Sequence, residues 1–340
     1  MIRKITLFLT LFVLMATFTC CTSEKGNHLP ASTGQPYEVV LEGDTAGIVS
    51  DMLMEDVPCL PQPEPFCNLV QVKRGKAKGS YLLVRNRVVV DINQRHKAFE
   101  VKLRKDENAT PQYVIRIKAK SAEQLKQKLN PAKLRSLIDQ NELAHLASSI
   151  QQNPEKQREV KQMFGLNLKI PASLDASKKA RGFIWLSNNA GSGMQNLIIF
   201  RLKGNGCKET NAWTYNIDEI NKILRLNILG ETNNMYMQLV SKDKRTKRDE
   251  ISEKEQVSEY DENLLPIERG LWEMRGDAMG GPYLMKVLPM SKGKIVTPRS
   301  FYEHPCNIDS RIVIIGFVYA PEMKKRNLLK QLEAVLTTIK

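Results

Sequence analysis

The chain carries none of the short patterns that identify common hydrolases and metalloenzymes. HExxH, GxSxG and a P-loop are absent, no two cysteines are spaced as CxxC, and the 340 residues include only four histidines. These absences remove the usual signals for zinc proteases, serine hydrolases, nucleoside triphosphatases, thioredoxin-like enzymes and zinc ribbons. We therefore predict no metal site and no cofactor, and we favour a non-catalytic role.

An apolar run at the N-terminus is too short to span a membrane. It extends over residues 5–18, follows Arg3 and Lys4, and is interrupted only by threonines. This length is typical of the hydrophobic core of a signal peptide and falls short of the roughly 20 residues that a membrane-spanning helix needs. We predict that residues 1–20 are a signal peptide and that the chain is exported to the cell envelope.

The end of this run resembles the lipobox of bacterial lipoproteins, in which a cysteine directly follows the cleavage site. Phe18, Thr19 and Cys20 precede Cys21, and an aromatic residue followed by two small ones is the looser form of the motif found in the Bacteroidetes. We predict that Cys21 carries acyl chains such as palmitate, with Cys20 as the alternative. Two or more fatty chains hold a protein stably on a bilayer.

The segment after the cysteine is polar and has no apolar periodicity. We assign residues 21–36 to a tether between the lipid anchor and the folded body. In some Bacteroidetes lipoproteins several acidic residues in this place favour export to the outer face of the cell, but Glu24 is the only one here. We expect a protein that faces the periplasm, attached to either the outer or the inner membrane.

Basic residues outnumber acidic ones. Loss of residues 1–20 removes Arg3 and Lys4 and lowers the formal net charge from +14 to +12. A nucleic acid is the usual partner of a basic chain, but an exported protein rarely meets one, and aromatic residues do not alternate with the basic clusters. We expect no nucleic acid, but contact with the membrane through the lipid anchor and with an acidic envelope glycan, an anionic lipid or a protein.

The order of elements predicts two α+β units. In each half, β-rich segments are followed by an amphipathic helical region, over residues 121–150 in the first half and 321–339 in the second. We assign residues 37–152 and 153–340 to the two units and expect similar halves, each a mostly antiparallel sheet flanked by helices. A strand is expected over residues 165–171. The buried stripe of the last helix is predicted to be Leu328, Leu332, Val335 and Ile339.

The stretch RGLWEMRGDAMGGPY, residues 269–283, predicts a hairpin. Trp272 and Met274 alternate with polar positions, and the glycines and proline that follow suit a turn. Four charged residues surround this turn and form a candidate site for a polar or anionic ligand: Arg269, Glu273, Arg275 and Asp277. The alternative is that they simply face solvent.

Two further candidate sites concern covalent chemistry. Cys59 and Cys67 flank a proline-rich loop and form a candidate disulfide, with buried free thiols as the alternative. Asp44-Thr45-Ala46 resembles the O-glycosylation acceptor of exported Bacteroidetes proteins, which makes Thr45 a candidate acceptor. The alternative is that Asp44 and Thr45 cap a helix predicted over residues 45–55.

Two long C-terminal segments carry a family resemblance. RGLWEMRGDAMGGPYLMK, residues 269–286, and IIGFVYAPEMKKRNLLKQLEAVL, residues 314–336, resemble the DUF4837 family of Bacteroidetes lipoproteins of unknown function. The resemblance implies a lipoprotein and supplies no activity or catalytic residue.

These observations favour a lipid-anchored binding or assembly component of the envelope without catalytic activity. The alternative is an envelope hydrolase that acts on a glycan or peptide with carboxylates such as Glu273 and Asp277 in a cleft between the halves.

Overall fold

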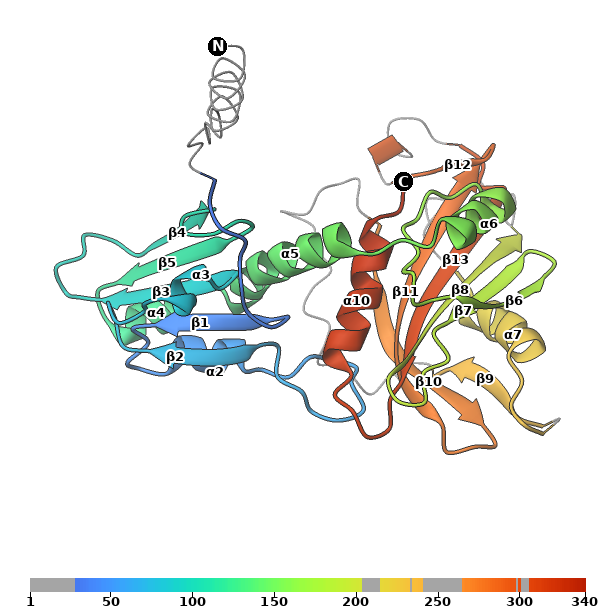
Figure 1. The fold of residues 1–340 in the computed structure, drawn as a ribbon, viewed down its shortest axis with the longest axis horizontal. Helices are drawn as coiled ribbons and strands as arrows, with labels where there is room; N and C mark the ends of the chain where they lie inside the picture. Colours follow the sequence, from blue (N-terminus) through green and yellow to red (C-terminus); the bar gives the residue numbers. More distant parts are fainter. Residues whose placement is uncertain (1–27, 204–214, 233, 241–264, 298, 301–305) are drawn as a thin grey trace, which may run out of the picture.

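The computed structural model describes residues 28–203, 215–232, 234–240, 265–297, 299–300 and 306–340. These residues form two units, each with its own β-sheet, that meet through one helix from each unit (Figure 1). The chain has the predicted α+β class, because its helices and strands form separate packed layers. Cys20 and Cys21, with the predicted signal peptide and the first part of the tether, lie outside the described residues.

The first sheet is mostly parallel, so the expectation of an antiparallel sheet in this half was wrong. Its strands lie in the order β2-β1-β3-β5-β4, with the bounds β1 Glu38–Glu42, β2 Asn68–Val72, β3 Asn86–Ile92, β4 Glu100–Lys105 and β5 Tyr113–Ala119. Only β4 runs antiparallel to its neighbour. The short helices α2 (Ile48–Leu53) and α3 (Ser80–Leu83) connect successive parallel strands, which need a crossover rather than a tight turn.

Helices cover one face of the first sheet. The side chains of Ser121 and Asn130 cap α4 (Ala122–Lys128) and α5 (Pro131–Ser149) by accepting backbone hydrogen bonds. With α2, these helices pack on every second residue of the central strands: Val39, Leu41, Val88, Val90, Ile115 and Ile117. β5 alternates accordingly, because Ile115, Ile117 and Ala119 are buried whereas Arg116 and Lys118 are half-buried.

The second sheet is antiparallel and carries helices on both faces. Its strands lie in the order β6-β7-β8-β13-β11-β10-β9, with β12 beside β11. The bounds are β6 Ala176–Ala180, β7 Phe183–Ser187, β8 Met194–Lys203, β9 Tyr236–Leu239, β10 Glu268–Arg275, β11 Gly280–Ser291, β12 Lys294–Ile295 and β13 Ser310–Tyr319. Because the first sheet is mostly parallel and this one is antiparallel, the expectation of two similar halves was also wrong.

Three helices flank this second sheet. α6 (Pro154–Phe164) and α10 (Arg326–Thr337) pack on one face, and α7 (Ile217–Asn227) packs on the other. β11 and β13 are consequently buried on both faces and are almost continuously apolar in sequence. Each helix in the described ranges is either too short or too polar to cross a bilayer.

The strand expected over residues 165–171 is irregular chain. Leu166, Leu168 and Ile170 are buried, as their alternation predicted. However, the backbone forms only isolated contacts, in which Asn167 exchanges two hydrogen bonds with Lys340. The segment packs its side chains as a strand does, but among the described residues it pairs with no strand and forms only an isolated bridge between Pro171 and Gln152.

The predicted hairpin over residues 269–283 is confirmed. β10 and β11 pair in an antiparallel register that ends at Glu273 and Gly280. The Trp272 indole is buried, donates to the Val318 carbonyl at 3.1 Å and lies 4.9 Å from the ring centre of Phe317. Trp272 is therefore a core residue, as its place on the apolar face indicated.

We expect Gly281→Ala to destabilise the second unit. An added Cβ at this position would come 2.2 Å from the Val318 carbonyl oxygen, which is backbone of the neighbouring chain segment and cannot move aside. Overpacking of this kind costs about 1–3 kcal/mol, so the denaturant midpoint should fall. Gly191→Ala is the matched control, because no atom lies within 4 Å of its added Cβ. Equal midpoints for the two variants would contradict the close approach of these segments.

Candidate functional site

The four charged residues of the hairpin do not converge on one point. Glu273 and Arg275 are exposed on β10, and Asp277 is exposed in the turn that follows. A carboxylate oxygen of Glu273 accepts a hydrogen bond from Gln238 at 2.6 Å. Arg269 is instead ion-paired with Glu333 of α10. Glu273, Arg275 and Asp277 remain a predicted polar surface, whereas Arg269 belongs to a different site.

That site is a cluster of charged side chains where α5 of the first unit meets α10 of the second, a contact that we call the seam. Lys330 lies 2.6 Å from Asp139 and 3.1 Å from Glu333. The Tyr37 hydroxyl also donates to Asp139, and Arg269 pairs with Glu333. A continuous series of polar contacts thus links the two units.

The protonation states of Tyr37 and Glu333 in the seam are fixed near neutral pH. Burial raises the pKa of Tyr37 well above its ordinary value, and the charge of Asp139 raises it further. Burial also opposes ionisation of Glu333, but Lys330 and Arg269 outweigh this effect and lower the pKa of that carboxyl. Tyr37 consequently keeps its proton and Glu333 stays ionised, which suits a structural ion cluster better than proton transfer.

The sequence did not reveal the charged side of α10. Arg326, Lys330 and Glu333 lie four and three residues apart and therefore share one helix face. Each is less than a tenth exposed. Polar residues of an amphipathic helix normally face solvent, but here Arg326 contacts Glu64 and Pro65 of the first unit and Lys330 contacts Asp139 of α5. Leu332 and Val335 are buried as predicted, whereas Leu328 and Ile339 are half-buried.

A second cluster of polar side chains lies in the first unit beside the seam. Glu142 of α5 is fully buried and accepts hydrogen bonds from Arg85 at 3.0 Å, from the Asn86 amide at 2.6 Å and from the Tyr37 backbone at 3.1 Å. Burial raises the pKa of Glu142, although Arg85 acts in the opposite direction. Glu142 thereby fixes the start of β1 and β3 against α5.

The first unit also caps α10. Glu64, which is 5% exposed, accepts hydrogen bonds from the backbone N–H groups of Lys325 and Arg326 at 2.7 and 3.1 Å. Free N–H groups at the start of a helix require an acceptor. The Arg326 guanidinium in turn donates to the Pro65 carbonyl and lies 5.7 Å from the ring centre of Tyr37. The two units are therefore joined at the beginning of α10 as well as along its length.

An uncharged groove of about 260 Å³ lies beside the seam. Its walls come from both units: Leu146, Ser149, Ile150, Gln151, Pro171, Ala172, Ser173, Leu174, Gln195, Gln331 and Leu332. The Gln195 amide donates to Gln331 at 3.0 Å. Gln331 is exposed, so the groove offers amide and hydroxyl groups between aliphatic side chains.

The candidate disulfide between Cys59 and Cys67 is not formed, because both residues are free thiols. The Cys67 thiol is buried against the Leu53 carbonyl, and this burial raises its pKa to about 12. The Cys59 thiol points instead to the Arg269 carbonyl in the second unit. The two sulfur atoms thus belong to different contacts.

Two further predictions concern Thr45 and a metal site. Thr45 is exposed. The Asp44 carboxylate accepts a hydrogen bond from the backbone N–H of Ser50, in the first turn of α2, at 2.8 Å. Asp44 therefore caps this helix, as the alternative interpretation predicted. O-glycosylation of Thr45 remains a prediction. Within the described ranges, no three His, Cys, Asp or Glu side chains gather in a way that could hold a metal ion.

Comparison with known families gives two matches. The model of the domain of unknown function DUF4837 matches residues 153–338, and that of the domain of unknown function DUF8532 matches residues 32–151. Comparison with curated proteins and with solved structures gives no match.

We expect the Glu333→Gln variant to lose part of the acid sensitivity of the protein. The pKa of Glu333 is lower in the folded state than its ordinary value of 4.5, so the unfolded state binds the proton more tightly. The resulting stabilisation is present above pH 4.5 and is lost as the pH falls below it. Urea denaturation over a pH series should show the native protein losing stability more steeply than the variant.

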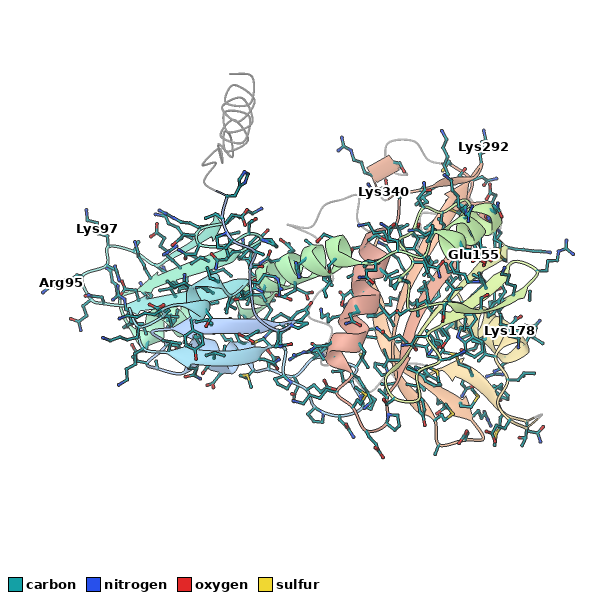
Figure 2. The ribbon with its side chains drawn as sticks, in the orientation of Figure 1. Arg95, Lys97, Glu155, Lys178, Lys292 and Lys340 are labelled. Atoms are coloured by element: carbon teal, nitrogen blue, oxygen red, sulfur yellow. The ribbon has the colours of Figure 1, made fainter. Side chains whose placement is uncertain are left out.

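Glu155→Gln is the control for this experiment, because Glu155 is 70% exposed on α6 (Figure 2). Stability curves of the native protein and Glu333→Gln that run parallel through this pH range would show that the seam does not lower the pKa of Glu333.

Proposed function

The chain belongs to the DUF4837 family, and from this premise we propose that it is a lipid-anchored protein of the cell envelope that binds a partner polypeptide without changing it chemically. The family supplies no activity, so support for this function comes from the site. The observation that carries it is the groove beside the seam, whose walls come from both units.

The composition of the groove suits a segment of neutral polypeptide. Its amide and hydroxyl groups can exchange hydrogen bonds with a peptide backbone, and its aliphatic side chains can accept apolar side chains. Leu146 and Ile150 come from the first unit, and Leu332 comes from α10. A partner in the groove would therefore contact both units at once.

The hairpin supports binding over the alternative of carboxylate catalysis. Glycosidases and similar hydrolases need two carboxyl groups that flank the scissile bond. Glu273 is exposed and engaged with Gln238, whereas Asp277 lies in the turn and accepts a hydrogen bond from the next residue. The two carboxylates are thus held by local contacts on an exposed strand and its turn.

The lipid anchor is supported by the order of residues at the N-terminus. A basic pair, an apolar run of signal-peptide length and then Cys20 and Cys21 follow one another within the first 21 residues. Such an anchor would hold the body close to one membrane and so limit its partners to those of the envelope.

We expect native protein from its own envelope to lack residues 1–20 and to carry acyl chains at Cys21. Intact-mass spectrometry and labelling with an alkyne analogue of palmitate would measure both. Cys21→Ala should abolish the acyl mass and the label, whereas the neighbouring control Cys20→Ala should retain them. Native protein without any acyl mass would exclude the anchor.

A second experiment tests the groove. We expect a photoreactive amino acid at Gln331, in the groove, to give a discrete protein adduct in intact envelopes. The same residue placed at Gln162, which is exposed on α6, is the matched control and should give none. Ser173→Trp, which fills the groove, should remove the Gln331 adduct. Identical adducts at both positions, or an adduct that survives Ser173→Trp, would count against binding in the groove.

A further inference from the structure

The outermost strand of the first sheet is strongly basic. β4 and the loop before it carry five lysine and arginine residues, which we call the basic edge: Arg95, Lys97, Lys102, Arg104 and Lys105. All five are exposed. Glu100 is the only acidic residue between them, and it pairs with Lys102 and Lys118. Within the described part of the chain, Arg95, Lys97 and Arg104 form no ion pair, although Arg104 lies close enough to Glu107 to help lower the pKa of that carboxyl.

The tether enters the body beside this edge. The backbone of Thr110, in the turn after β4, donates to the Pro30 carbonyl at 2.9 Å and accepts from Ser32 at 3.1 Å. Figure 1 shows that the described chain begins next to β4. The attachment is fixed, because these are backbone hydrogen bonds to a turn of the sheet.

The length of the tether keeps the basic edge near its point of anchorage. Nine peptide units separate Cys21 from Pro30, and a fully extended chain spans at most about 3.5 Å per residue, or roughly 32 Å in total. The basic edge thus lies within a tether length of the membrane to which Cys21 would attach. Charged groups that approach a bilayer within a Debye length of about 8 Å are attracted by anionic lipids.

We propose that the basic edge docks on a layer of anionic lipid headgroups and so sets the orientation of the body on the membrane. This inference rests on the proposed lipid anchor. With the β4 edge against the lipid, the groove remains open to partners.

Charged edge strands also have a simpler role, since lysines protect an exposed sheet edge from pairing with another chain. The structure provides a control for this alternative. β6 is the outermost strand of the second sheet and carries exposed Lys178 and Lys179. Figure 2 shows Lys178 at the opposite end of the molecule from Arg95 and Lys97. Both edges carry exposed lysines, although β6 has fewer of them and its Lys179 pairs with Glu159, and they differ in their distance from the tether.

The test is lysine footprinting of the acylated full-length mature protein on vesicles. Vesicles of phosphatidylcholine alone are compared with vesicles that also contain phosphatidylglycerol, and acetylation of each lysine is measured by mass spectrometry. We expect Lys97, Lys102 and Lys105 to become several-fold less reactive only on the anionic vesicles, and to recover in high salt. Lys178 and Lys179 should keep the same reactivity on both.

Matched variants sharpen the test. Each basic residue near an anionic surface contributes about fivefold to binding, so Arg104→Gln with Lys105→Gln should weaken binding to the anionic vesicles roughly 25-fold and remove most of the protection of Lys97 and Lys102. Lys178→Gln with Lys179→Gln removes the same charge from the distant edge and should leave that protection unchanged.

Several outcomes would overturn the proposal. One is equal protection of the basic-edge lysines on neutral and anionic vesicles. Another is protection that survives in the variant Arg104→Gln with Lys105→Gln. A third is aggregation of that variant with an unaltered footprint. Protection in native envelopes but not on anionic vesicles would show that the basic edge binds an acidic glycan or protein instead of lipid headgroups. Attachment to neutral vesicles tests the anchor separately: if it fails while the anionic footprint remains, the docking stands and the anchor does not.

Discussion

The ion cluster in the seam constrains how the two units fit together. Lys330 lies between Asp139 of the first unit and Glu333 of its own helix. Removal of one partner from a buried ion pair costs several kcal/mol, whereas the complete pair contributes little compared with well-packed apolar groups. The cluster therefore acts mainly by selecting one relative position of the units, because any other position would leave a buried charge without its partner.

This constraint gives the groove a defined shape. Its lining includes Ile150 at the end of α5 and Leu332 on α10, so its width depends on the distance between helices that the cluster holds together. The cap that Glu64 provides at the start of α10 fixes the same helix at its other end. A ligand site built between units is usually adjustable, but the polar contacts on this seam make the groove largely preformed.

The sequence predicted local structure well where one side of an element faces water. The hairpin around Trp272, the helix from Arg326 and the half-buried strand β5 all follow from alternation or helical periodicity. The direction of strand pairing in the first sheet could not be obtained in this way, because parallel and antiparallel strands share the same alternation. The charged face of α10 was missed for a related reason, since its burial depends on a helix almost 200 residues earlier in the chain.

The cap on α10 also has a consequence for biosynthesis. Glu64 is translated more than 250 residues before Lys325 and Arg326, and N-terminal domains generally fold first. Until α10 emerges, a first unit that folds early must keep the carboxylate of Glu64 hydrated, with the face that will receive α10 still open. Docking of α10 then withdraws this carboxylate from water, so that a helix made late closes a surface prepared much earlier in the chain.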